Sequence, residues 1–215
     1  MLTRRDLGTI LPQDGVRGDH DWLNDNTINA WFGALCMAKS EQAGYQRNSK
    51  TPPPIAAFNS AWWMNVTKAG KGVEGIKTWS RRQGVKGEKL LHAEKIFFPI
   101  NTGAHWTLLV ISGRDRTIEH LDSLSTPVSG KRERSIARAW LAMELEDRYL
   151  AEEWTDLDSS SARQPNLSDC GVFACFNGLA AVRGVDYGEV GSLRNKREKM
   201  AAVLINGGFS GLFGL

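Results

Sequence analysis

The chain has 215 residues, of which 41% are hydrophobic and 24% are charged, and its formal net charge is +3. This composition is typical of a globular protein with one core, and it excludes collagen, a long coiled coil and a wholly disordered chain. The mild positive charge gives no argument for a nucleic-acid partner, and the apolar runs are far shorter than the ~20 residues that span a membrane.

The first half of the chain predicts a polar arm, one amphipathic helix and a basic surface. Residues 1–20 form the arm, and no apolar stretch follows its early charges, so we expect no signal peptide. A cap signal at 24–26 precedes apolar residues at helical spacing, namely Ile28, Trp31, Phe32, Leu35 and Cys36. Prolines at 52–54 interrupt regular structure, and 58–66 predicts a short helix or strand. The Gly-rich, basic segment 67–95 predicts a solvated surface.

The second half of the chain predicts strands followed by helices. Strands are expected at 96–100, 105–111, 117–122 and, at a sheet edge, 152–157. The strand at 105–111 is apolar on both faces, as in the centre of a sheet. Helices are expected over 131–150, from Cys170 onward and over about 192–206, before a loosely packed tail over 207–215. This order predicts the α+β class, with one domain over 1–215.

The turn between the two central strands determines which residues face each other. If Gly113 and Arg114 form a two-residue turn, His105 lies opposite Asp122. Opposed residues share a face of the sheet with Cβ atoms ~4.5–5.5 Å apart, so the carboxylate could orient the imidazole and favour its protonated form. A longer, bulged turn would shift this register, and a lone histidine on a strand can also be an ordinary core or surface residue.

The three cysteines are an odd, sparse set, which is typical of free thiols in a reducing compartment. Cys170 opens the most apolar predicted helix, and a helix N-terminus stabilises a thiolate, the nucleophilic form. Gly171 would let a substrate backbone approach closely. The alternative for a cysteine is a small buried hydrophobe, which we expect for Cys36 and Cys175. Gln164 could donate an amide N–H to an oxyanion, although loop glutamines are common.

Four segments occur in the order found in a known protein family. They are Trp22–Asp25, His105–Trp106, Leu121–Leu124, and Gln164 with Ser168–Cys175. His105 precedes Asp122 by 17 residues and Gln164 precedes Cys170 by 6, which are also the family's spacings. On these motifs the chain resembles the sentrin-specific proteases, cysteine proteases that mature and remove SUMO and related ubiquitin-like modifiers. Pro165 and Leu167 depart from the family's pattern, which leaves the shape of the loop before Cys170 open.

The resemblance implies an α+β, papain-like or adenoviral-protease-like cysteine protease fold, with a central mixed sheet flanked by helices. The catalytic residues it implies are His105, Asp122, Cys170 and, for the oxyanion hole, Gln164. It also implies that Trp22 and Trp106 line a narrow tunnel for a Gly-Gly tail, because two indoles leave room only for residues without side chains. Asp25 would contact a basic residue of the modifier, unless it is instead the N-cap of its helix.

The resemblance also implies the partner and the compartment. The partner would be a ubiquitin-like protein and its conjugates, SUMO first and NEDD8 or ubiquitin as alternatives, with no nucleic acid and no membrane. The location would be intracellular, in the nucleus or cytoplasm, or inside a host cell after delivery. The chemistry would need no metal or organic cofactor, and the four histidines show no paired metal-ligand spacing. Two other functions remain open, an inactive module that binds a ubiquitin-like protein and a thiol acyltransferase of the same fold.

Overall fold

The computed structural model of the protein describes residues 2–11, 22–47, 49–68, 70–124, 130–158 and 161–215. Half of the arm expected over 1–20, namely residues 1 and 12–20, therefore lies outside the described residues. Five strands form one sheet in the order β1-β2-β3-β4-β5. The strands are β1 (Ile55–Ala57), β2 (Lys95–Asn101), β3 (Trp106–Ser112), β4 (Thr117–Leu121) and β5 (Thr155–Leu157). The outer pairs are parallel and the inner pairs antiparallel, so the expected mixed sheet is confirmed.

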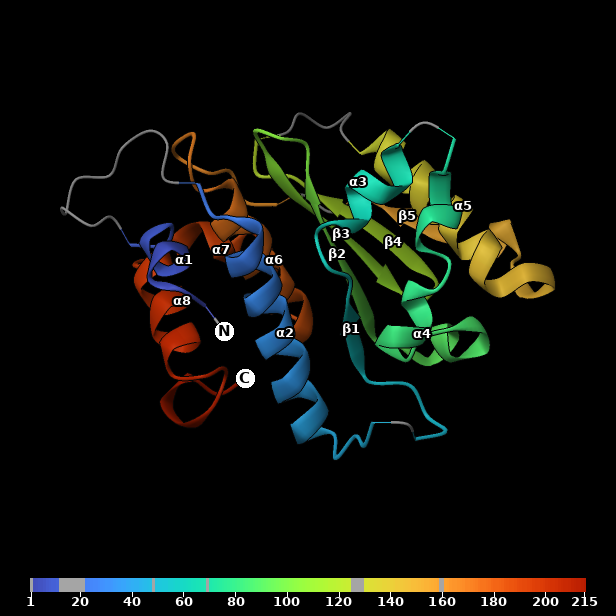
Figure 1. Cartoon of the computed structure of the whole chain (residues 1–215), viewed down its shortest axis with the longest axis horizontal. Helices are drawn as coiled ribbons and strands as arrows, with labels where there is room; N and C mark the ends of the chain where they lie inside the picture. The colour runs from blue at the N-terminus through green and yellow to red at the C-terminus, as the bar shows by residue number, and fades with distance from the viewer. Residues whose placement is uncertain (1, 12–21, 48, 69, 125–129, 159–160) are drawn as a thin grey trace.

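Helices cover both faces of this sheet, with α2, α6 and α8 on one side and α3 and α5 on the other (Figure 1). The α-helices are α1 (Arg4–Gly8), α2 (Asp25–Gln42), α3 (Trp62–Thr67), α4 (Trp79–Gln83), α5 (Lys131–Leu145), α6 (Cys170–Arg183), α7 (Glu189–Ser192) and α8 (Lys196–Ile205). Short 3-10 helices lie at Gly72–Ile76, Gly87–His92, Glu146–Arg148, Ala151–Glu153 and Gly211–Phe213. Within the described ranges, none of the helices has the length and apolar character needed to cross a membrane.

The central strand β3 contributes to two hydrophobic cores. Leu108 and Val110 pack in the core that includes α2 and α6, whereas Leu109 and Ile111 pack in the core that includes α3 and α5. Successive side chains of a strand point to opposite faces, so a strand covered on both sides must be apolar throughout. All seven residues of β3 are buried, which confirms the central strand expected at 105–111.

The turn between β3 and β4 differs from the two-residue turn that the sequence suggests. Residues Gly113–Arg116 form the connection, and Ser112 pairs with Thr117. The Ser112 hydroxyl donates to the Asp115 carboxylate at 2.7 Å, and Arg116 adopts a left-handed conformation with φ 55°. Gly113 passes so close to the Leu90 carbonyl that a Cβ would lie 1.8 Å from its oxygen. The predicted register was therefore wrong by two residues, because the turn is longer.

Three smaller expectations also needed correction. The strand β1 was not expected, because it is only three residues long and directly follows the prolines. The helix expected over 131–150 ends at Leu145, because Glu146 has φ 51° and cannot continue it. The tail over 207–215 is not uniformly loose. Phe209 is buried, with its ring centroid 4.9 Å from that of Trp31 in an edge-to-face arrangement.

Candidate active site

A histidine and an aspartate meet at one end of the central hairpin. His105 directly precedes β3 and Asp122 directly follows β4. Because Leu108 pairs with Leu121, Asp122 lies diagonal to His105 and not opposite it. A two-residue shift keeps both on the same face of the sheet, and diagonal neighbours remain within reach of long side chains. The imidazole Nε2 and the carboxylate Oδ1 are 2.6 Å apart.

The Asp122 carboxylate is held in its ionised form. Burial alone would raise the pKa of Asp122, but hydrogen bonds from His105 and from the Leu124 backbone N–H outweigh it and lower the pKa. The Leu124 N–H donates to the same oxygen, Oδ1, at 2.9 Å. A carboxylate that is fixed in this way favours the protonated form of the adjoining imidazole.

The His105 imidazole is shared between Asp122 and Cys170. Its pKa is raised to about 9, first by the hydrogen bond to Asp122 and then by the Cys170 side chain, against the opposing effect of burial. Asp122 occupies Nε2, whereas Nδ1 is buried and has no conventional hydrogen-bond partner within the described ranges. Nδ1 is thus the ring atom left for the thiol. At neutral pH the ring is an imidazolium, which stabilises a neighbouring thiolate.

Cys170 differs from the other two cysteines in its position. It is the first residue of α6, where backbone N–H groups have no partner within the helix, and its side chain is buried beside His105. Burial raises the pKa of Cys36 to about 12 and the pKa of Cys175 well above its usual value. Neither of these thiols is ionised at neutral pH, which agrees with the packing role expected for them.

The Gln164 side chain is anchored in the loop before Cys170. Its Oε1 accepts a hydrogen bond from the Ser123 hydroxyl at 2.6 Å, and its Nε2 donates to the Asn166 carbonyl at 2.6 Å. Its backbone N–H donates to the Ser123 carbonyl at 3.1 Å. The second N–H of the amide is not needed for either contact. Ser123 follows Asp122 directly, so the end of β4 orients both the aspartate and the glutamine.

The two tryptophans differ in exposure. Trp22 is 37% exposed, and its Nε1 donates to the Leu167 carbonyl at 3.1 Å. Trp106 is only 4% exposed, and its Nε1 donates to the Leu23 carbonyl at 2.9 Å. Trp106 therefore reaches the backbone next to Trp22. These bonds hold residues 22–23 against β3 and against the loop before Cys170.

Gly171 and Asp25 have surroundings that the sequence left open. A Cβ on Gly171 would lie 3.1–3.3 Å from side-chain atoms of Leu23, Trp106 and Ile28. The close approach to Gly171 that the structure shows is internal packing, and the approach of a substrate backbone to Gly171 stays a prediction. The N-cap of α2 is Asn24, whose side chain accepts from the Thr27 N–H, so Asp25 is not the cap and lies exposed in the first turn.

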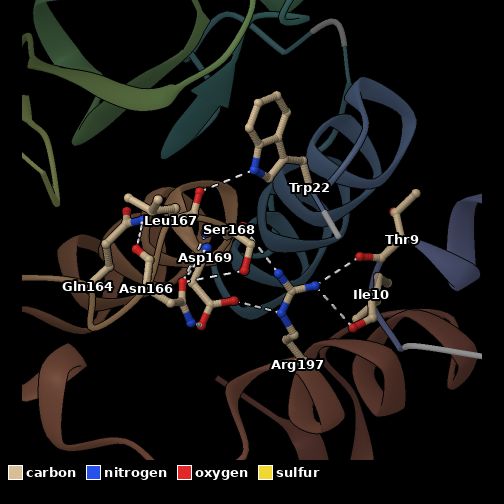
Figure 2. A network of polar contacts seen from close by, with 9 residues as sticks. All are labelled: Thr9, Ile10, Trp22, Gln164, Asn166, Leu167, Ser168, Asp169 and Arg197. Carbon is tan, nitrogen blue, oxygen red and sulfur yellow. Dashed lines mark hydrogen bonds and ion pairs between the residues drawn. The ribbon is translucent and has the colours of Figure 1, made fainter. Parts of the chain in front are cut away.

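A buried arginine completes the surroundings of the loop before Cys170 (Figure 2). Arg197, near the start of α8, donates from Nε to the Asp169 carboxylate at 2.7 Å and from Nη2 to the Ser168 carbonyl at 3.2 Å. Its side chain is only 2% exposed. The sequence alone does not indicate a role for Arg197, because a basic residue in a charged helix is ordinarily solvated.

Comparisons with known proteins show which sequences and structures this chain resembles. The sequence model of the Ulp1 protease family, C-terminal catalytic domain, matches residues 21–202. Ubiquitin-like-specific protease 1 of Saccharomyces cerevisiae is 29% identical over 203 residues, which cover 91% of this chain and 28% of that protein. Sentrin-specific protease 2 of Homo sapiens is 29% identical over 181 residues, covering 81% of this chain and 27% of that protein. The chain thus spans about a quarter of the length of these relatives.

Solved structures show the same fold. The Ulp1-like SUMO protease catalytic domain of Chaetomium thermophilum is 32% identical with a TM-score of 0.85, covering 100% of this chain and 82% of that one. The Ulp1 protease domain in complex with Smt3, the yeast ortholog of SUMO, is 25% identical with a TM-score of 0.70, covering 95% of this chain and 83% of that one.

Proposed function

Because the chain belongs to the Ulp1 protease family, we propose that it is a cysteine protease that cleaves after the C-terminal Gly-Gly of SUMO or a related ubiquitin-like modifier. The observation that carries this proposal is the 2.6 Å contact between His105 and Asp122, with Cys170 beside the same imidazole. A nucleophile, a base and a group that orients the base are the components of acyl transfer through a covalent intermediate. The solved complex of a related Ulp1 domain with Smt3 supports SUMO as the first candidate.

The reaction begins with the Cys170 thiolate, whose proton is held by His105. The sulfur attacks the carbonyl carbon of the terminal glycine of the modifier, forming a tetrahedral intermediate. His105 then protonates the leaving nitrogen, a lysine amine or a peptide amine, and the C–N bond breaks to leave a thioester. Water attacks the thioester while His105 accepts its proton, and the released thiolate regains the starting state. Asp122 keeps the ring oriented throughout.

Two donors would bind the oxyanion of the tetrahedral intermediate. One is the backbone N–H of Cys170, and the other is the amide N–H of Gln164 that neither Ser123 nor Asn166 uses. One such donor contributes about 2.7–4 kcal/mol to the transition state in comparable sites. The Asn166 carbonyl can only accept, so it fixes which side of the Gln164 amide carries the nitrogen, and the Ser123 hydroxyl donates to the oxygen on the other side.

Substrate selection would involve both tryptophans and the exposed Asp25. Trp22 and Trp106 would flank the Gly-Gly tail, and Asp25 would meet a basic residue on the modifier. We place the whole catalytic unit in one domain over 1–215, acting inside a cell, in the nucleus or cytoplasm or inside a host cell after delivery. Choice among SUMO, NEDD8 and ubiquitin would depend on the surface away from the tail, because all three tails end in Gly-Gly.

A panel of probes tests the proposal. SUMO, NEDD8 and ubiquitin, each carrying a C-terminal electrophile, are incubated with the purified chain, and adducts are mapped by mass spectrometry. We expect labelling of Cys170 by the SUMO probe and loss of labelling in Cys170→Ser, with Cys36→Ser as the matched control that still labels. Labelling of Cys36 or Cys175 in the unmodified chain would contradict the assignment, and probe binding without turnover would favour a binding module.

A further inference from the structure

An acidic residue directly precedes the proposed nucleophile. Asp169 is the N-cap residue of α6, yet its side chain makes no hydrogen bond to that helix. An aspartate at this position ordinarily accepts from N–H groups of the first turn. There its negative charge would lie at the same end of α6 as the oxyanion that the proposed reaction forms, and it would repel that oxyanion. The location of this carboxylate therefore matters for the proposed reaction.

Two side chains hold the Asp169 carboxylate away from the helix. The Arg197 Nε donates to Oδ1 at 2.7 Å, and the Asn166 Nδ2 donates to Oδ2 at 2.8 Å. Both oxygens are thus engaged outside α6, and the guanidinium compensates the negative charge. Figure 2 shows Arg197 lying between Asp169 on one side and the backbone of Thr9 and Ile10 on the other.

Arg197 is itself fixed from that second side. Its Nη1 donates to the Thr9 carbonyl at 2.9 Å and to the Ile10 carbonyl at 3.3 Å. Its Nη2 donates to the Ser168 carbonyl, so all three guanidinium nitrogens make contacts in different directions. A planar group held at three nitrogens has one orientation, which a lysine ammonium cannot reproduce.

The same contacts fix the backbone that leads into Cys170. The Asn166 Oδ1 accepts from the backbone N–H groups of Ser168 at 3.0 Å and Asp169 at 2.9 Å. The Ser168 carbonyl accepts from Arg197, and the Asp169 carbonyl accepts from the Phe173 N–H at 2.9 Å. Each backbone polar atom of the two residues before Cys170 is therefore bonded, and the next group along the chain is the Cys170 N–H.

We propose that Arg197 is a positioning residue that, through Asp169 and Asn166, keeps the carboxylate off the N-terminus of α6 and directs the Cys170 N–H toward the oxyanion. This inference rests on the proposed function, because only acyl transfer produces that oxyanion. Arg197 does not touch the substrate, so its effect should appear in kcat and not in KM.

Exchanging the amide of Asn166 and the carboxylate of Asp169 tests the inference. The variant Asn166→Asp places two carboxylates, and so two acceptors, against each other. The variant Asp169→Asn places the amide N–H groups of residues 166 and 169, and so two donors, against each other. Each single variant should lose about 100-fold in kcat, the cost of misplacing a catalytic group by about 1 Å. The double variant Asn166→Asp/Asp169→Asn again pairs a donor with an acceptor and keeps both backbone contacts of residue 166. It should recover at least about tenfold of the loss, with KM unchanged.

The rate of alkylation by iodoacetamide shows whether a variant changes the Cys170 thiol itself or only the position of the Cys170 backbone N–H. The sulfur displaces iodide from a CH2 carbon in this reaction, so no oxyanion forms. Its rate at Cys170 should stay within about threefold of wild type in each variant, since thiolate reactivity and not oxyanion binding sets it. Arg197→Lys should lose kcat in the same way, whereas Arg194→Lys, an exposed residue just before α8, is the matched control and should not. Thermal unfolding of each variant ensures that folded protein is compared.

The outcomes distinguish this inference from the proposed function. An alkylation rate that falls together with kcat would overturn the inference, because the thiol itself would then be impaired. A double variant as slow as the single variants, or single variants as fast as an active wild-type chain, would overturn the inference alone. A wild-type chain that turns over none of the three modifiers overturns the proposed function and the inference with it.

Discussion

The substitution Asp122→Asn tests how the carboxylate controls the imidazole. It removes the carboxylate whose hydrogen bond contributes most to raising the pKa of His105 from 6.5 to about 9. At pH 8, a group with a pKa of about 9 is about 90% protonated, whereas one at its ordinary pKa is about 3% protonated. Loss of imidazolium alone therefore lowers activity up to about 30-fold at pH 8 and hardly at all at about pH 6. Cys170 also raises this pKa, so about 30-fold is an upper limit.

The assay is the pH dependence of kcat/KM for release of a fluorophore from the C-terminus of SUMO. In wild type the alkaline limb should fall near pH 9, the raised pKa of His105. In Asp122→Asn it should move toward pH 6.5, in addition to a loss at every pH from the misoriented ring. Asp156→Asn, on the exposed strand β5, is the matched control. An alkaline limb at the wild-type pH in Asp122→Asn would refute the reasoning.

The ion pair between His105 and Asp122 predicts how the free energy of unfolding depends on pH. Because the pKa of His105 is raised in the folded state, the imidazolium stabilises the fold fully below about pH 6.5, and this contribution is lost as the pH rises through about 9. The side chain is 21% exposed, and the shift corresponds to at most about 3 kcal/mol. Urea unfolding should show this decline in wild type, and a smaller one in Asp122→Asn.

Three further substitutions address the remaining site residues. Gln164→Ala should lower kcat about 100- to 1000-fold with little change in KM, because it removes one of the two proposed oxyanion donors, and steady-state kinetics with a SUMO substrate measures both. Trp22→Ala should mainly raise KM for a SUMO substrate, because the indole is partly exposed and would contact the tail, and unchanged KM would exclude that contact. Gly171→Ala should lower the free energy of unfolding by about 1–3 kcal/mol, since its Cβ would overpack against Trp106, and urea denaturation measures this loss.

The hairpin shows why the sequence predicted the histidine–aspartate contact despite a wrong register. Side chains alternate between faces with a period of two, so a two-residue error leaves His105 and Asp122 on the same face. The turn itself was mispredicted, because its length depends on Arg116 in a left-handed conformation and on the Ser112–Asp115 bond. Neither is a property of the Gly113–Arg114 pair alone.

Contacts between distant segments account for what the sequence could not predict. Arg197 is 28 residues from Asp169 and more than 180 from Thr9, and nothing in the local pattern of α8 indicates that it would be buried. The same is true of Gly171, which is closely approached by Leu23, by Ile28 of α2 and by Trp106 of β3. The helix of Cys170 was predictable from its apolar periodicity, because that signal is local.

The proposed nucleophile and base are attached to a single hydrophobic core. Cys170 at the start of α6, and Trp106 directly after His105, belong to the same buried cluster between the sheet and the helices α2 and α6. Unfolding of this one core would therefore displace both groups together. Heat inactivation and the cooperative melting of this core should consequently coincide in one thermal transition.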